Sequence, residues 1–353
     1  MTSPVTEPAA RTAEPSAPVG AQSPAGLAHL PVSIFATVMG IGGSALAWQR
    51  AAATLELSPI PGRVFAWTAL VVFATVSVAY ATKTIRYPAA VRREWRHPVM
   101  LAFAATIPVS MLILAAALLG PSRPLSTALW WPGAVAQLVL TLYVLRVWIA
   151  DPRFAPGHVH PAWFIPVVGN LVVPLAGTAH APADISWFFF AVGLGYWIAL
   201  LPIVLNRLFL HGPLPPRLAP TLAILIAPPA VAYLAWLHLG GAVTDPAARI
   251  LLHLATFQAL LLAAQSGALR KLPFTLSAWA YTFPLAALTS AFLTESRAGA
   301  TGYRIAAVLA VTVLSLLVTA LTVRTLVAAR RRQLCRPEPL PPLPPRAEQG
   351  AVT

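Results

Sequence analysis

Long apolar stretches constrain the fold of this chain more than any other feature of its sequence. A helix needs about 20 apolar residues to cross the hydrocarbon core of a bilayer, where it satisfies its own backbone hydrogen bonds. Ten stretches of about that length follow one another, near 29–49, 62–82, 99–119, 127–149, 161–181, 184–205, 218–239, 248–267, 274–293 and 304–326. The sequence therefore predicts an all-α integral membrane protein with ten transmembrane helices.

Composition excludes most other classes of protein. Of the 353 residues 58% are hydrophobic and 10% are charged, whereas a soluble domain carries about 25% charged residues. The formal net charge of +14 resides in connectors and in the C-terminal tail rather than on one amphipathic face, so we expect no nucleic-acid partner. Cys335 is the single cysteine, which excludes an internal disulfide.

The basic residues predict the orientation of the protein. The connectors after the even-numbered spans and the C-terminal tail hold Lys83, Arg86, Arg92, Arg93, Arg96, Arg153, Arg207, Arg217, Arg270, Lys271, Arg330, Arg331, Arg332 and Arg336. The opposite side holds Arg50, Arg63, Arg123, Arg249, Arg297 and Arg304. Because cytoplasmic loops carry the excess of Lys and Arg, both termini are expected in the cytoplasm.

Three regions can be distinguished along the chain. Residues 1–28 are rich in Ala, Pro and Ser and are expected to form a disordered cytoplasmic arm. Residues 29–326 are the ten-helix transmembrane domain, and 327–353 form a basic, proline-rich cytoplasmic tail. No docking motif marks either tail.

Prolines distinguish the odd-numbered spans from the even-numbered ones. The odd spans contain Pro31, Pro108, Pro166, Pro174, Pro228, Pro229 and Pro284, while in the even spans Pro132 and Pro202 lie near helix ends. An interior proline removes a backbone hydrogen bond and destabilises a helix by about 3 kcal/mol. Prolines that recur in alternate spans therefore indicate that the bends in these helices have a functional role. We interpret the pattern as five helical hairpins with odd helices inside and even helices outside, with kinks at Pro108, Pro166, Pro228 and Pro284. The alternative is that these prolines only bend tolerant membrane helices.

The distribution of charge favours an anion as cargo. All ten acidic residues lie in connectors, tails or helix ends, namely Glu7, Glu14, Glu56, Glu94, Asp151, Asp184, Asp245, Glu295, Glu338 and Glu348. Carboxylates in mid-membrane are typical of proton relays and cation sites, so their absence argues against a cation pump. A neutral path with positive flanks suits anion conduction. Candidates to line it are Phe35, Gly40, Phe103, Asn170 and Tyr281, although glycines and aromatics also serve helix packing.

The sequence contains no signature of an enzyme. We find no phosphate loop, nucleophile elbow or histidine box, so neither catalysis nor a cofactor is expected. His158 and His160 give only a weak indication of a metal site. His180, His238 and His253 fall near the outer ends of their spans, where they are either interfacial or part of a pH-sensitive mouth.

Four segments resemble one family in matching order and spacing. They read LPVSIFATVMGIGGSALAW in the first span, RHPVMLAFAATIPVSMLILA entering the third, HPAWFIPVVGN entering the fifth and SAWAYTFPLAALTSAF in the ninth. They are similar to the tellurite-resistance/dicarboxylate transporter family, which includes the bacterial TehA proteins and the plant guard-cell slow anion channels. The resemblance covers residues 28–330.

This resemblance implies a homotrimer in a bacterial inner membrane, in which each protomer has its own pore within the odd helices. It also implies that Phe283 plugs the pore in mid-membrane. Pro284 follows Phe283 directly and is expected to loosen the local helix. Two positions depart from the bacterial pattern: Leu201 stands where relatives tend to have glutamate, and Val38 where some have proline.

Three functional hypotheses are compatible with the sequence. The first is a gated channel for small inorganic or organic anions. The second is a secondary carrier for C4-dicarboxylates such as malate, for sulfite or for tellurite-related oxyanions. The third is a membrane scaffold or sensor that acts through its cytoplasmic tails.

Overall fold

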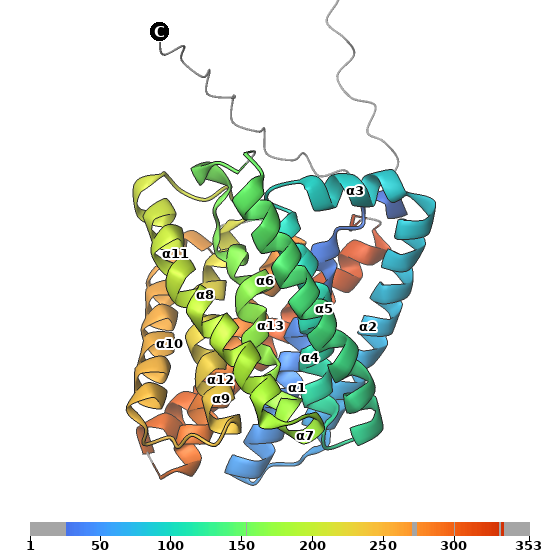
Figure 1. Ribbon diagram of the computed structural model, residues 1–353. Coiled ribbons are helices and arrows are strands. Elements are labelled where there is room, and N and C mark those ends of the chain that lie inside the picture. Colours follow the sequence, from blue (N-terminus) through green and yellow to red (C-terminus); the bar gives the residue numbers. More distant parts are fainter. Residues whose placement is uncertain (1–25, 153, 270–273, 300, 332, 335–353) are drawn as a thin grey trace, which may run out of the picture.

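The computed structural model describes residues 26–152, 154–269, 274–299, 301–331 and 333–334. Within these ranges the protein is helical and contains no β-strand. Ten helices are long and apolar enough to span a membrane: Val32–Leu55, Ile60–Arg86, Leu101–Leu118, Arg123–Ala150, Pro161–His180, Ala183–Leu210, Ala219–His238, Pro246–Ala264, Leu276–Arg297 and Thr301–Arg330. We number them as spans 1 to 10 (Figure 1). The predicted all-α membrane fold with ten spans is confirmed.

The ends of the spans differ from the expected ones, and the differences change where charged residues lie. Span 1 continues to Leu55, so Arg50 belongs to this helix and not to a connector as the sequence suggested. Span 9 likewise extends to Arg297. Residues 1–25 of the expected N-terminal arm and 335–353 of the expected tail lie outside the described residues, whereas Leu27–His29 form a short 3₁₀ helix.

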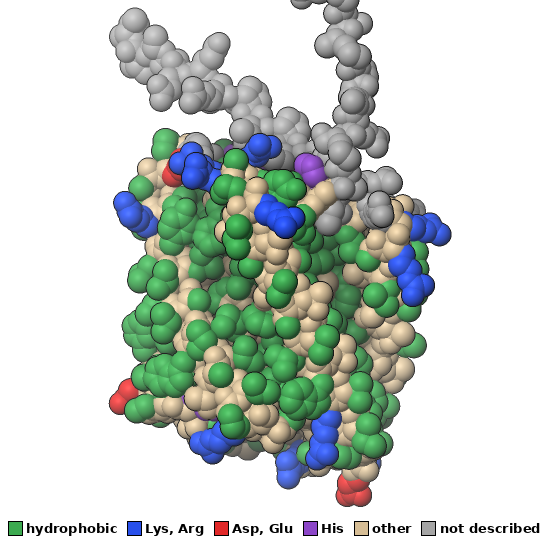
Figure 2. Space-filling view, turned by 90° about the vertical axis from the view of Figure 1, so that its right-hand side faces the viewer, with side chains coloured by type: hydrophobic (Ala, Val, Ile, Leu, Met, Phe, Trp, Pro, Cys, Tyr) green, Lys and Arg blue, Asp and Glu red, His purple; other side chains and the backbone are tan. Residues whose placement is uncertain are grey.

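A band of apolar side chains surrounds the molecule between two charged ends. Figure 2 shows this band on one face, with Lys and Arg gathered above and below it. Both ends of the described chain lie at the top in Figure 1, and we call this the terminal face and its opposite the far face. The band has the distribution expected of a multi-pass membrane protein.

Odd and even spans differ in burial. Between 67% and 89% of the most apolar window is buried in the odd spans, against 17% to 33% in the even ones. Each odd span packs against the even span that follows it, and the odd spans contact one another in a closed ring, 1–3–5–7–9–1. The apolar surface of the even spans is therefore available for lipid or for other protein.

The even spans are uninterrupted α-helices. They are α2 (Ile60–Arg86), α5 (Arg123–Ala150), α8 (Ala183–Leu210), α10 (Pro246–Ala264) and α13 (Thr301–Arg330). Pro132 and Pro202 lie inside α5 and α8. Short helices in the connectors are α3 (Pro88–Arg96), η4 (Pro156–His158) and α11 (Ser266–Leu269).

Each odd span changes helix type along its length. From the terminal face, a 3₁₀ segment precedes an α-helix: η2 (Val32–Phe35) and α1 (Ala36–Leu55), η3 (Leu101–Ala105) and α4 (Thr106–Leu118), η7 (Ala219–Ile226) and α9 (Ala227–His238), η8 (Leu276–Tyr281) and α12 (Thr282–Arg297). Span 5 is broken more often, into η5 (Pro161–Trp163), α6 (Phe164–Val168), η6 (Gly169–Val172) and α7 (Pro174–His180).

The four prolines expected at kinks occupy these changes of helix type. Pro108, Pro166, Pro228 and Pro284 each lie within the first three residues of α4, α6, α9 and α12. In the first turn of an α-helix the backbone N–H groups have no i−4 partner within that helix, so a proline there removes none of the hydrogen bonds of the α segment. The prolines thus begin new α segments after 3₁₀ turns and do not interrupt continuous α-helices.

Polar side chains of span 4 stabilise the broken span 5. The carbonyl of Pro166 accepts hydrogen bonds from Gln137 Nε2 at 2.9 Å and from Thr141 Oγ1 at 2.7 Å. Asn170 Nδ2 donates to Thr141 Oγ1 at 2.9 Å and to the carbonyl of Val167 at 2.7 Å. Since all three side chains are buried, these bonds supply the partners that a regular helix would have given the backbone.

A buried ion pair joins α3 to α2, and hydrogen bonds from the same two side chains reach the start of span 1. Glu94 Oε2 lies 2.7 Å from Lys83 Nζ, with the two side chains 9% and 3% exposed. Glu94 also accepts hydrogen bonds from the backbone N–H of Val32 at 2.6 Å and from Tyr80 O–H at 3.1 Å. Lys83 Nζ donates in addition to the carbonyl of Leu30 at 2.7 Å. Helix α3, which the apolar pattern did not reveal, is therefore bound both to α2 and to the terminal-face end of span 1.

Candidate functional site

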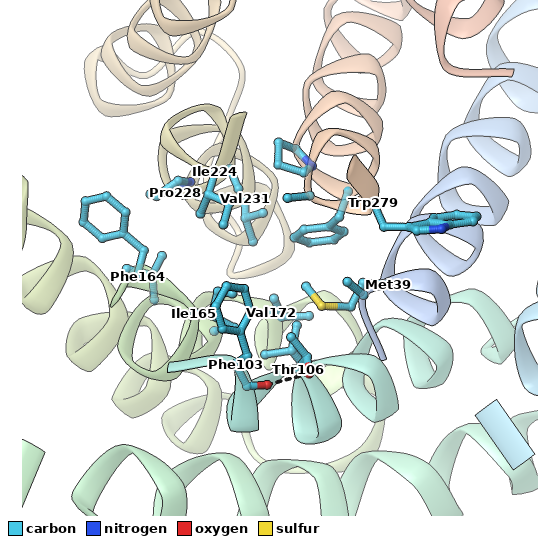
Figure 3. Close-up of a pocket in the computed structure, with 18 residues that line it drawn as sticks. Met39, Phe103, Thr106, Phe164, Ile165, Val172, Ile224, Pro228, Val231 and Trp279 are labelled. Carbon is cyan, nitrogen blue, oxygen red and sulfur yellow. Dashed lines mark hydrogen bonds between the residues drawn. The ribbon is translucent and has the colours of Figure 1, made fainter. Parts of the chain in front are cut away.

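Two cavities follow one another along the ring of odd spans. The one nearer the terminal face, which we call the neck, has a volume of about 70 Å³. It is lined by all five odd spans, through Ala36, Met39, Phe103, Thr106, Val109, Phe164, Ile165, Val168, Gly169, Val172, Ile224, Ala227, Pro228, Val231, Trp279, Ala280, Phe283 and Pro284. Figure 3 shows labelled members of this set converging from different helices on one space.

The neck presents an almost wholly apolar wall. Thr106 is its one hydroxylated residue, and that hydroxyl donates to the carbonyl of Phe103 at 2.6 Å and lies 3.2 Å from the carbonyl of Val32. Its hydrogen-bonding capacity is thus directed into the backbone of spans 1 and 3. A narrow apolar constriction of this kind excludes water and hydrated ions by dewetting.

The second cavity, which we call the vestibule, opens toward the far face and is larger, about 340 Å³. All five odd spans line it as well, but with their C-terminal halves. Its polar lining comprises Gln49, Arg50, Ser290, His238 and Arg297. Two guanidinium groups therefore face a space in which no carboxylate takes part in the lining.

Phe283 and Val231 line both cavities. Phe283 is the second residue of α12 and is 8% exposed. Span 1 accommodates its ring because Gly43 has no side chain: a Cβ there would lie 3.2 Å from Phe283 Cδ2. The phenyl ring therefore lies at the boundary between an apolar and a polar chamber.

The five residues expected to line a path have different positions. Phe103 lines the neck. Phe35 instead makes edge contacts with Phe73 and Tyr80 of span 2 at ring distances of 6.0 Å. Neither Gly40 nor Asn170 nor Tyr281 belongs to the lining of either cavity.

Gly40 and Asn170 serve packing between helices. A Cβ at Gly40 would lie 2.9 Å from Trp279 Cε3, so this glycine permits the close approach of spans 1 and 9. Asn170 points toward span 4, as its bond to Thr141 shows. Of the four prolines, Pro228 and Pro284 line the neck, whereas Pro108 and Pro166 do not.

Sequence reasoning missed several lining residues. Met39, Phe164 and Val231 are ordinary apolar residues, and only helix rotation decides that they face the neck. Arg50 was assigned to a connector because the apolar stretch ends just before it. A signal was available, since Gln49 and Arg50 continue a helical sequence that has no turn residue before Leu55.

Histidines gather near the terminal-face end of the neck. His160 is 1% exposed and stacks on Phe103 with ring centroids 5.8 Å apart. Burial lowers the pKa of His160 to about 3, and burial also lowers the pKa of His97. His160 is therefore neutral at physiological pH. In the described part of the chain no group of three or more His, Cys, Asp or Glu side chains could hold a metal ion.

Comparison with known proteins assigns the family. The family model described as voltage-dependent anion channel, SLAC1, matches residues 29–326. The chain belongs to this family.

Its relatives include plant and prokaryotic proteins. The S-type anion channel SLAH2 of Arabidopsis thaliana is 29% identical over 279 residues, which cover 76% of this chain and 53% of that protein. The tellurite resistance protein TehA homolog of Haemophilus influenzae is 26% identical over 263 residues, covering 74% and 80%. An uncharacterized transporter of Methanocaldococcus jannaschii is 26% identical over 276 residues, covering 72% and 81%. The chain thus spans about half the length of the plant channel and about four fifths of the prokaryotic relatives.

Proposed function

We propose that this protein is a gated channel for small anions, with one path per protomer through the vestibule and the neck and with Phe283 as the gate. One observation carries the proposal: the Phe283 side chain belongs to the lining of both cavities. The family and the name of the plant relative support an anion as the cargo.

The electrostatics of the two cavities support the same proposal. The vestibule offers Arg50 and Arg297 to an incoming anion, and the neck offers neither a positive charge that would hold it nor a negative one that would repel it. Conduction requires binding weak enough for release. An apolar neck blocked by an aromatic ring gives a closed state, and rotation of the Phe283 side chain to another rotamer would open it.

The distribution of charge supports one orientation of the protein in the membrane. We place both termini in the cytoplasm of a bacterial cell and the vestibule on the outer side of the plasma membrane, because the terminal face carries α3 with its three exposed arginines Arg92, Arg93 and Arg96. We further propose a homotrimer in which even spans of neighbouring protomers meet. Cross-linking in native membranes, with a ladder ending at three protomers, tests this assembly.

The gate is tested by reconstituting wild type and Phe283→Ala in liposomes and measuring flux of chloride, nitrate, sulfite and malate at a set voltage. Phe292→Ala is the matched control, since Phe292 lies on the same helix with a similar exposed fraction, 9%, but lines neither cavity. We expect anion flux well above wild type in Phe283→Ala alone. Equal flux in well-folded Phe283→Ala and wild type would refute the gate.

The same preparation distinguishes a channel from a carrier. Two prokaryotic relatives bear names of transport or resistance rather than of a channel. Saturable counterflow of labelled malate or sulfite without single-channel current steps would refute the channel proposal and support a secondary carrier.

A further inference from the structure

The vestibule contains an unusual arrangement of charge at Arg50. This side chain projects from α1 into the cavity and is half-buried. Its Nη1 donates to the neutral hydroxyl of Thr294 at 2.5 Å. Among the described residues no carboxylate lies within salt-bridge distance of Arg50. A guanidinium group has five N–H donors, so most of its capacity remains for another partner.

The carboxylate of Glu295, next to Thr294 in the chain, is not part of the cavity wall. Glu295 accepts a hydrogen bond from Tyr233 O–H at 2.8 Å and takes no part in lining the vestibule. A partly desolvated cation without a counterion is costly, and a bound anion would remove that cost.

The neutral histidine of the vestibule uses its one N–H group on the protein backbone and has none left for an anion. His238 Nδ1 lies 2.8 Å from the carbonyl of Leu234. Because a carbonyl oxygen only accepts, Nδ1 carries the proton, and Nε2 of the neutral ring is an acceptor. The attraction for an anion therefore rests on Arg50 and on the more exposed Arg297.

The geometry of guanidinium favours one class of anion. Its planar fork of parallel N–H groups matches two oxygens of a planar oxyanion, whereas a halide is a single atom at which the two N–H groups cannot both point in parallel. A cavity of about 340 Å³ has room for such an ion with several waters.

We propose that the vestibule is a binding site for small planar oxyanions of the carboxylate or nitrate type, anchored by Arg50 at the far-face entrance to the neck. This inference rests on the proposed function only in taking the vestibule as part of the anion path. The site selects the ion before it meets Phe283, so selection and gating reside in different residues.

Equilibrium binding tests the site without conduction. Nitrate, formate and chloride are titrated by calorimetry into wild type, Arg50→Gln and Arg50→Lys in nanodiscs of neutral lipid. Arg63→Gln is the matched control, because Arg63 is an exposed arginine near the start of α2 and does not line the vestibule. Loss of charge-assisted hydrogen bonds should raise the Kd for nitrate and formate about tenfold or more in Arg50→Gln. Arg50→Lys should keep chloride binding and lose the preference for oxyanions.

Three outcomes would overturn the proposal: no saturable nitrate or formate binding to wild type, an unchanged Kd in folded Arg50→Gln, or an equal loss in Arg63→Gln. A melting temperature for each variant shows whether it is folded. Flux through Phe283→Ala separates this inference from the proposed function. High flux with no effect of Arg50 on binding would refute the site alone, whereas Arg50-dependent binding with no flux would refute the channel and leave the site.

Discussion

The ion pair between Lys83 and Glu94 provides a measurable test of how α3 is attached to α2 and to the start of span 1. Replacing Glu94 by Gln removes the negative charge beside Lys83, whose side chain is 3% exposed, and leaves it only neutral partners such as the carbonyl of Leu30. Removing one member of a buried pair costs about 3–5 kcal/mol, because the other charge stays buried and uncompensated. At about 2–4 °C per kcal/mol for a large domain, the melting temperature should fall by about 6–20 °C.

Replacing the other member of the pair, Lys83, should lower the free energy of unfolding by less. In Lys83→Met the carboxylate of Glu94 keeps two donors, the N–H of Val32 and the O–H of Tyr80. The double variant Lys83→Met/Glu94→Gln contains no unpaired charge and should be more stable than the sum of the single effects predicts, by about 1–3 kcal/mol. Melting in detergent at one fixed scan rate measures all four proteins, since membrane proteins often unfold irreversibly.

Additivity of the two single substitutions to within about 0.5 kcal/mol would refute this reasoning. It would mean that Lys83 finds water or another acceptor once Glu94 is neutral. A greater loss in Lys83→Met than in Glu94→Gln would show that the donors to Glu94 do not stabilise its charge.

Two further predictions concern packing and pH. Gly40→Ala should destabilise the protein by about 1–3 kcal/mol, because the new Cβ would lie 2.8 Å from Thr282 Cβ. Gly195→Ala is the matched control: this glycine lies in a helix with open space around it, and the substitution should stabilise the protein by about 0.5–1 kcal/mol. Equal melting temperatures of the two variants would contradict the close approach of spans 1 and 9. Burial lowers the pKa of His160 to about 3. Below the ordinary histidine pKa of about 6.5, the unfolded chain therefore binds a proton that the folded protein does not. The free energy of unfolding should then fall by about 1.4 kcal/mol for each pH unit below that value. The melting temperature of wild type should therefore drop more between pH 7.5 and pH 5.5 than that of His160→Phe. An equal drop in the two proteins would contradict the burial of a neutral imidazole.

The prolines show how far sequence reasoning extends. Their recurrence in alternate spans is visible in the sequence because proline has a fixed backbone effect wherever it occurs. The structural consequence of that effect depends on the helix around each proline. Pro108 and Pro284 occur in the same kind of position, the first turn of an α segment, yet Pro284 lines the neck and Pro108 does not.

The sequence by itself determined the ten spans, their order and the absence of acidic residues from their middles, because bilayer thickness and the cost of buried charge act on each segment independently of its neighbours. Only the tertiary structure decided which side of each helix faces a cavity. Phe35 and Phe103 both precede an α segment of an odd span, but the first packs on span 2 and the second on the neck. Such differences arise from rotations of helices in a close-packed ring, and Phe283 and Arg50 acquire their places at the two cavities from the same packing.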